Sequence, residues 1–133
     1  MKRFYENSKI AKALLFEGYS TIAIGWFVFS KLEKIPQRTK IHETIHALQW
    51  TEVTSVAFVL IACFSWLISP YWLLISPFLY YIMYVIEWLV RLPSGDAYRN
   101  ISFEREAFDM QHKVQYPYER DLFSWIKYLK KKD

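Results

Sequence analysis

The chain has 133 residues, of which 53% are hydrophobic and 20% aromatic, and its formal net charge is +4. This length suits one domain, residues 1–133, but the apolar fraction is high for a soluble domain of that size. The basic excess favours anionic lipid headgroups over nucleic acid, because no basic cluster adjoins a recognisable base-binding motif. The single cysteine, Cys63, has no partner within the chain, which excludes an internal disulfide.

The N-terminal part of the chain is predicted to form short elements. Residues 2–16 show a weak amphipathic pattern that either lies on a membrane surface or packs on the domain. Residues 19–30 are rich in β-branched and aromatic side chains and are too short to span a bilayer. They are therefore predicted to form a strand or a two-strand β ribbon. A polar connection with Pro36 as its breaker follows.

A helix is expected over residues 39–52, with Thr39 as its cap, and it contains the sequence HETIH. His42 and His46 are four residues apart, so a helix places both imidazoles on one face, where they can bind one metal ion. Glu43 can hydrogen-bond a metal-bound water without being a ligand, which suits a general base. The plainer alternative is that both histidines are interfacial residues of a helix entering a membrane, with Glu43 solvated near the helix start.

The following 40 residues contain most of the apolar excess. Residues 53–68 and 71–92 are predicted to be two transmembrane helices of a hairpin, because one crossing needs about 20 apolar residues. Pro70 marks the expected turn, although Pro77 can also break or kink the second helix. Basic residues flank the hairpin at both ends and the turn has no charge, so both termini are predicted to be cytoplasmic.

The C-terminal part is predicted to return to helix. A helix over residues 102–115 contains Glu104, with Ser102 as its cap, and an amphipathic helix over residues 119–132 is expected at the headgroup level. The predicted fold class is thus mainly α and integral membrane. It combines the two-helix transmembrane hairpin with a small cytoplasmic part made of the histidine helix, the glutamate helix and the β ribbon.

The sequence HETIH, followed at a distance by FEREA, resembles the glutamate-type zincin metallopeptidases. It is most similar to the membrane family of the CAAX prenyl proteases and the bacterial heat-shock membrane protease. The resemblance implies a small zincin-like part in which His42, His46 and Glu104 bind zinc, since the third ligand in that family is a glutamate three residues before an alanine, here Ala107. It also implies a location in the bacterial inner membrane.

The resemblance is incomplete beside the third ligand. Family members usually have an aspartate directly after the alanine, whereas this chain has Phe108, and its nearest aspartate is Asp109. Glu106 is an alternative ligand, but two residues along a helix point to different faces. If Glu104 binds the metal, Glu106 is expected to pair with a surface base, Arg99 or Arg105.

Several supporting roles are open at this stage. Gln49 lies one turn after His46 and can hydrogen-bond a metal ligand. His112 can stabilise an oxyanion or simply pack, and a tyrosine can serve the same electrophilic role; the candidates are Tyr98, Tyr116 and Tyr118. Glu87 is expected to pair with Arg91 at the membrane interface.

The sequence therefore predicts a zinc-dependent metallopeptidase at the cytoplasmic membrane surface, with Glu43 as base, and with membrane lipids as partners. Its substrates would be peptides or membrane proteins, and the resembled family implies that a strand near residues 19–30 pairs with the substrate backbone. Two alternatives are a non-catalytic membrane adaptor with a structural metal and a zinc hydrolase acting on a non-peptide amide. The sequence predicts no oligomeric state.

Overall fold

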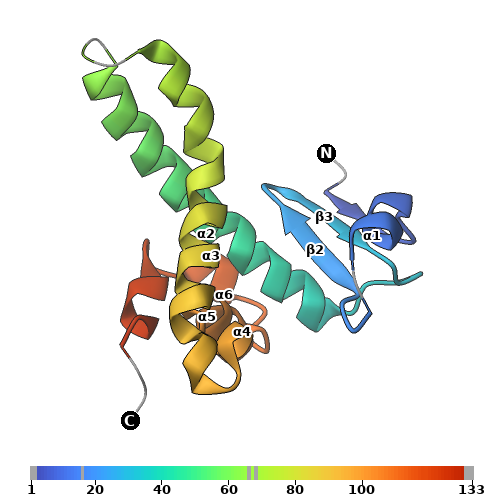
Figure 1. Ribbon diagram of the computed structural model, residues 1–133. Helices are drawn as coiled ribbons and strands as arrows, with labels where there is room; N and C mark the ends of the chain where they lie inside the picture. The colour runs from blue at the N-terminus through green and yellow to red at the C-terminus, as the bar shows by residue number, and fades with distance from the viewer. Residues whose placement is uncertain (1–2, 16, 66, 68, 131–133) are drawn as a thin grey trace.

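The computed structural model describes residues 3–15, 17–65, 67 and 69–130, and they are mostly helical with one small sheet (Figure 1). The strands are β1 (Phe4–Tyr5), β2 (Thr21–Ile24) and β3 (Phe27–Ser30). The α-helices are α1 (Lys9–Leu14), α2 (Gln37–Phe64), α3 (Leu79–Arg91), α4 (Ala97–Asn100), α5 (Ser102–Met110) and α6 (Tyr116–Glu119). Three 3₁₀ segments complete the chain: η1 (Pro70–Phe78), η2 (Leu92–Ser94) and η3 (Ser124–Tyr128).

The predicted β ribbon is an antiparallel hairpin of β2 and β3, and β1 adds a parallel strand that the sequence did not indicate. The strand order is β1-β3-β2, so β2 lies at an edge of the sheet. Gly25 has a φ of 57° in the tight turn, where its missing side chain removes the usual steric cost. Its N–H donates to the Tyr81 hydroxyl at 2.7 Å, and a Cβ at this position would lie 3.5 Å from the Trp50 ring, so the turn of the hairpin packs on the helices.

Helix α1 covers only part of the predicted amphipathic stretch, whose residues 2 and 16 lie outside the described part of the chain. Ala11 on this helix is fully buried, and the helix packs against β3. The N-terminal segment therefore packs on the domain.

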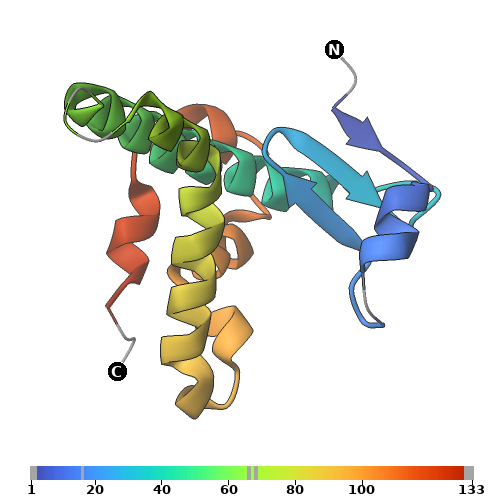
Figure 2. The same cartoon turned by 45° about the horizontal axis from the view of Figure 1, so that its top comes forward.

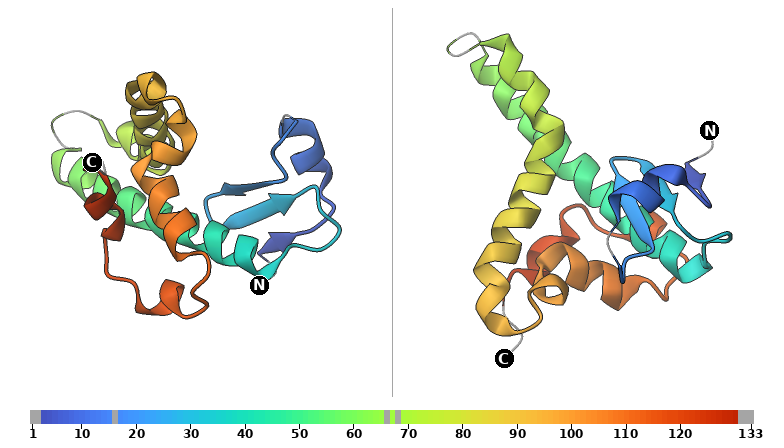
Figure 3. Two further views of the ribbon diagram at one scale, coloured as in Figure 1. Left: turned by 90° about the horizontal axis from the view of Figure 1, so that it is seen from below. Right: turned by 45° about the vertical axis from the view of Figure 1, so that its right-hand side comes forward.

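Helix α2 begins at Gln37, two residues before the expected start, and continues without a break from the histidine segment to Phe64. Most residues between 41 and 53 are buried, whereas most residues between 54 and 64 are exposed although they are apolar. This second half packs beside η1, and the two project away from the sheet and the C-terminal segments (Figures 1 and 3). We call residues 54–64 together with η1 the apolar arm.

The second predicted membrane helix, 71–92, is not a single α-helix. Residues Pro70–Phe78 are a 3₁₀ segment and the α-helix begins only at Leu79. Pro77 has no N–H to donate to the carbonyl of Leu73, and the Ser76 hydroxyl donates to that carbonyl instead at 2.8 Å. Helix α3 then crosses α2 at a large angle and leads down to the C-terminal segments (Figure 2).

The C-terminal part is more broken than the sequence predicted. Helix α5 ends at Met110 rather than residue 115, where the Gln111 side chain bonds the carbonyl of Phe108 at 3.0 Å. The predicted amphipathic helix over 119–132 is wrong for the described residues, because Phe123 adopts a φ of 58° and only the short η3 follows it. Residues 131 and 132 lie outside the described part of the chain.

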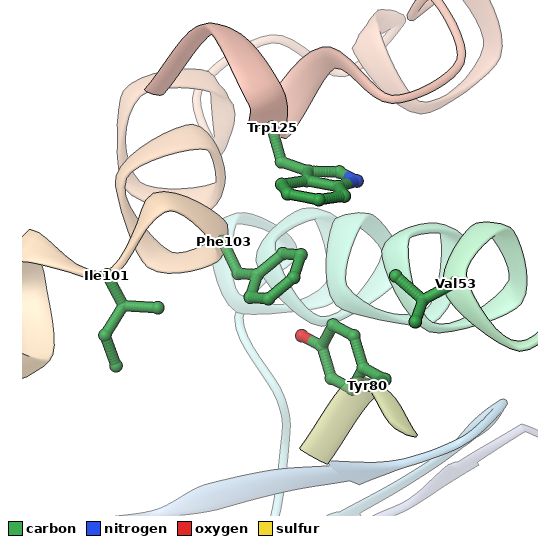
Figure 4. Packing of buried hydrophobic residues seen from close by; sticks show 5 residues of the cluster. All are labelled: Val53, Tyr80, Ile101, Phe103 and Trp125. Carbon is green, nitrogen blue, oxygen red and sulfur yellow. The ribbon is translucent and has the colours of Figure 1, made fainter. Parts of the chain in front are cut away.

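Glu87 on α3 positions the start of α5. Its carboxylate accepts the Ser102 N–H at 2.9 Å and the Ser102 hydroxyl at 2.6 Å, so Glu87 caps the helix and Ser102 does not. The expected pair of Glu87 with Arg91 is confirmed at 3.1 Å. Below this cap, the Phe103 ring lies between Trp125 and Tyr80, at 4.7 and 4.8 Å between ring centroids (Figure 4). The hydrophobic core thus joins α3, α5 and η3.

Candidate metal centre

Three side chains from two helices meet beside the sheet. His42 and His46 lie one turn apart on α2, and Glu104 lies in the first turn of α5. The Nε2 atoms of the two histidines are 3.0 Å apart. Glu104 Oε2 lies 3.4 Å from His42 Nε2, and Glu104 Oε1 lies 3.2 Å from His46 Nε2. All three side chains are buried, and this group can hold a metal ion. The sequence prediction that these residues converge is confirmed; the identity of the metal stays a prediction.

His46 is oriented by a hydrogen bond at Nδ1, the ring nitrogen that faces away from the metal position. Its Nδ1 lies 2.9 Å from Gln49 Oε1, as expected for a residue one turn further along the helix, and 3.3 Å from the Tyr80 hydroxyl. A histidine that binds metal through one ring nitrogen is normally oriented by a partner on the other nitrogen. Gln49 supplies that partner for His46.

His42 has no such support among the described residues. Its Nδ1 is buried without a hydrogen-bond partner, and the Phe108 ring packs edge-on against the imidazole at 4.8 Å. Asp109, the nearest aspartate in sequence, is exposed on the outside of α5. The departure from the zincin pattern at residue 108 therefore coincides with a missing contact to one candidate ligand.

Glu104 is kept in its charged form by its neighbours. Burial alone raises the pKa of this carboxyl, but the charge and hydrogen bond of His46 outweigh burial and hold the pKa below its ordinary value. The Tyr84 hydroxyl donates to Oε1 at 2.8 Å, whereas Oε2 is buried with no hydrogen-bond partner among the described residues. Burial and then the charge of Glu104 raise the pKa of Tyr98. Glu104 thus offers an anionic oxygen that a metal ion can bind.

A cavity of about 250 Å³ connects the three side chains to β2. Glu43 is buried, lines this cavity with the histidines, and is not one of the three converging residues. The remaining walls come from the connection before β2, from β2 and its turn, and from aromatic residues of α2, α3 and α4; they are Leu15, Tyr19, Thr21, Ile22, Ala23, Gly25, Trp50, Tyr80, Tyr81, Tyr84 and Tyr98. The arrangement allows a small molecule or an extended chain to approach a bound metal beside Glu43.

The structure separates the remaining candidates. His112 is exposed and does not line the cavity, and neither Tyr116 nor Tyr118 lines it, whereas Tyr98 does. Tyr80 and Tyr84, which contact His46 and Glu104, were missed by sequence reasoning. Their spacing of four residues on one helix was a usable signal, but ten tyrosines in the chain obscured it.

Glu106 is not part of the converging group, but its predicted partner was wrong. It is fully buried and pairs with Arg120 at 2.8 Å rather than with Arg99 or Arg105 at the surface. Its second carboxylate oxygen accepts from Gln49 at 2.9 Å. The glutamate that turns away from the metal position therefore contacts the residue that supports His46.

Comparisons with known proteins identify no family for this chain. The chain matches no protein-family description, no curated protein and no solved structure. The resemblance of HETIH and FEREA to zincin peptidases consequently concerns those two motifs alone. The function has to be inferred from the geometry of the site itself.

Proposed function

We propose that this protein is a zinc-dependent metallopeptidase anchored in a membrane by its apolar hairpin. The observation that carries the proposal is the convergence of His42 Nε2, His46 Nε2 and the Glu104 carboxylate. The two nitrogens are 3.0 Å apart, and one carboxylate oxygen lies 3.4 Å from His42 and the other 3.2 Å from His46. Tetrahedral zinc with bonds of about 2.1 Å holds its ligand atoms about 3.4 Å apart. Two imidazoles and one carboxylate also leave the fourth position open for water, as catalytic zinc sites do.

Glu43 is the proposed general base. Zinc, when bound, lowers the pKa of a coordinated water and polarises the carbonyl of the scissile bond. Glu43 takes a proton from that water as its oxygen adds to the carbonyl carbon, and then gives the proton to the nitrogen as the C–N bond breaks. The products are a carboxylic acid and an amine. The burial of Glu43 beside the histidines supports this role, because it keeps the carboxylate close to the reacting atoms.

Strand β2 is the proposed partner of the substrate backbone. Lys31 N–H bonds the carbonyl of Ser20, so alternation along the antiparallel pair directs the backbone of Ile22 and Ile24 toward β3. The backbone groups of Thr21 and Ala23 then point to the free edge, and both residues line the cavity. An extended peptide added at this edge would lie alongside the metal position. This favours a polypeptide substrate over a compact amide.

The apolar helices support membrane anchoring. Gln37–Phe64 and Pro70–Arg91 are long and apolar enough to cross a bilayer. Only 28% and 11% of their most apolar stretches are buried inside the protein, so lipid is the natural cover for the rest. Tyr84, which touches Glu104, lies seven residues before Arg91, about 10 Å along the helix. The proposed site is thus nearer the charged end of the hairpin than its turn.

The catalytic proposal is tested by comparing Glu43→Gln with the parent protein in detergent or liposomes. Both should contain about one zinc per chain, because Glu43 is not a ligand, while only the parent should cleave a mixed peptide library read out by mass spectrometry. Cleavage that persists in Glu43→Gln would exclude this mechanism. A zinc-loaded parent that generates no new peptide ends would favour the adaptor with a structural metal.

The membrane topology is tested with one new cysteine. Cys63 is exposed on α2, so it is first replaced in a Cys63→Ser background, and Tyr71→Cys is then added at the hairpin turn. The proposed orientation, with both termini in the cytoplasm of a bacterial cell, predicts that a membrane-impermeant thiol reagent labels this cysteine from outside intact cells. Labelling that requires broken membranes would reverse the orientation.

A further inference from the structure

A buried polar network lies behind His46, on the side away from the cavity. We define it as Gln49, Glu52, Glu106, Tyr116 and Arg120. The Glu106 carboxylate accepts four hydrogen bonds, from Arg120 Nε at 2.8 Å and Nη2 at 3.1 Å, from the Tyr116 hydroxyl at 2.9 Å and from Gln49 Nε2 at 2.9 Å. Arg120 also bonds Glu52 through its other terminal nitrogen. The side chains of Arg120, Glu106 and Glu52 are at most 5% exposed.

The network determines which way the Gln49 amide faces. Its Nε2 donates to the carbonyl of Phe103 at 3.1 Å and to Glu106 at 2.9 Å, and both partners are pure acceptors. Turning the amide over would place its oxygen against a carbonyl and a carboxylate. Oε1 must therefore face His46, at 2.9 Å from Nδ1.

The direction of the amide favours one tautomer of His46. Because Gln49 Oε1 can only accept, it stabilises a proton on Nδ1, so that a metal ion beside Glu104 meets the Nε2 lone pair. Nε2 is the atom that meets His42 and Glu104 at the metal position. Glu104 thus approaches one nitrogen of the ring, while Glu106, two residues further along α5, acts on the other through Gln49.

We propose that Glu106, held by Arg120, is a positioning residue of the metal centre: it fixes the Gln49 amide and thereby keeps His46 in the metal-binding tautomer. The inference rests on the proposed metal site, but the contact between Gln49 Oε1 and His46 Nδ1 is a property of the metal-free protein as well. The two can therefore fail separately. A parent protein that binds no zinc refutes the proposed function, whereas the tautomer measurement still decides the role of Glu106.

The decisive experiment exchanges the two side chains. In Glu106→Gln, the new amide oxygen pairs with Arg120 and its nitrogen faces Gln49 Nε2, so two donors oppose each other and only the Phe103 carbonyl still favours the parent orientation of the Gln49 amide. Zinc affinity should then fall about 10- to 100-fold, the usual effect of losing an orienting partner. Adding Gln49→Glu removes this donor clash and keeps an acceptor on His46 Nδ1, but it places one oxygen against the Phe103 carbonyl, so the double variant should recover part of the lost affinity at unchanged net charge.

Glu52→Gln is the matched control. It perturbs the same arginine from the other side but does not touch Gln49, so it should lower the melting temperature without weakening zinc binding. Zinc affinity is measured by chelator competition. The proposal is overturned if Glu106→Gln binds zinc like the parent, or if it is weakened no more than Glu52→Gln and the double variant restores nothing.

A spectroscopic measurement on metal-free Glu104→Gln leaves the network unchanged. This variant removes the carboxylate that lies 3.2 Å from His46 Nε2 and competes with Gln49 for the ring proton. The chain has only three histidines, so ¹⁵N-histidine NMR at alkaline pH resolves each ring, with His42→Ala and His112→Ala giving the assignment. The neutral form of His46 should carry its proton on Nδ1. A proton on Nε2 would refute the proposal without any change to the network.

Discussion

The two candidate histidine ligands lie one turn apart on α2 but in unlike surroundings. Behind His46, Gln49 Oε1 lies 2.9 Å from Nδ1, and Gln49 is itself held by the buried network. Behind His42, the Phe108 ring packs against the imidazole, and Nδ1 is buried without a hydrogen-bond partner in the described part of the chain. One side of the metal position is organised by directed bonds, and the other by packing alone.

This difference indicates which histidine limits the affinity of the site for a metal ion. Gln49 already orients the His46 ring, so that Nε2 is directed at the metal position. His42 can adopt either tautomer, and its buried N–H stays unsatisfied when Nε2 binds the metal. We therefore expect the His42 side to limit the affinity of the site, and three predictions test this asymmetry.

The largest effect is expected from Glu104, whose carboxylate reaches both histidines. Glu104→Gln should reduce the zinc content from about one per chain to almost none, because a charged ligand is lost from the centre of the site. The melting temperature should also stop responding to a chelator. Elemental analysis and thermal melts measure both.

The control for this variant is Glu106→Gln, which should still load zinc when zinc is in excess. The opposite pattern, with a zinc-poor Glu106→Gln and a normal Glu104→Gln, would mean that the third ligand is misassigned by two residues.

A smaller effect is expected from repairing the His42 side. Phe108→Asp places a carboxylate where the aromatic ring now meets His42, and Arg99, at 5.2 Å from that ring, can balance the new charge. An acceptor for Nδ1–H should strengthen zinc binding about 10-fold, the lower limit for an orienting partner. Chelator competition measures the change. Asp109→Asn, one residue further on an exposed face, should change nothing. A folded Phe108→Asp with unaltered affinity would show that His42 needs no partner.

The smallest effect is expected on the stability of the folded protein at acid pH. The pKa of Glu104 is lowered in the folded protein, where burial raises it but His46 lowers it more, so folding favours the charged form. This stability is present above the ordinary pKa of 4.5 and is lost as the pH falls toward the folded value. In the chelated protein, the urea midpoint should therefore decline below pH 4.5 more steeply for the parent than for Glu104→Gln. Parallel declines would contradict the contribution of Glu104.

Features that depend on local spacing could be predicted from the sequence. His42 and His46 share a face because of the helical period, and Glu104 and Gln49 follow from short motifs around them. The apolar runs indicated the two long helices, and β-branched residues indicated the hairpin of β2 and β3. Each of these required only information within a few residues.

Features that depend on distant parts of the chain could not be predicted. Arg120 reaches Glu106 across 14 residues and Glu52 across 68, so nothing near Glu106 identifies its partner. Phe123 breaks the expected C-terminal helix by a left-handed backbone that leads into the packing of Trp125 against Phe103. Glu87 replaces Ser102 as the cap of α5 for the same reason, since the cap comes from another helix.

The 3₁₀ geometry of η1 has a consequence for the reach of the apolar arm. Nine residues of 3₁₀ helix extend about 18 Å at about 2.0 Å per residue, whereas an α-helix of the same nine would extend only about 13.5 Å. Helix α2 needs about twelve residues for that distance of about 18 Å. The nine residues of η1 can therefore lie along about twelve residues of α2, and an α-helix of the same nine residues would cover about 4.5 Å less of it.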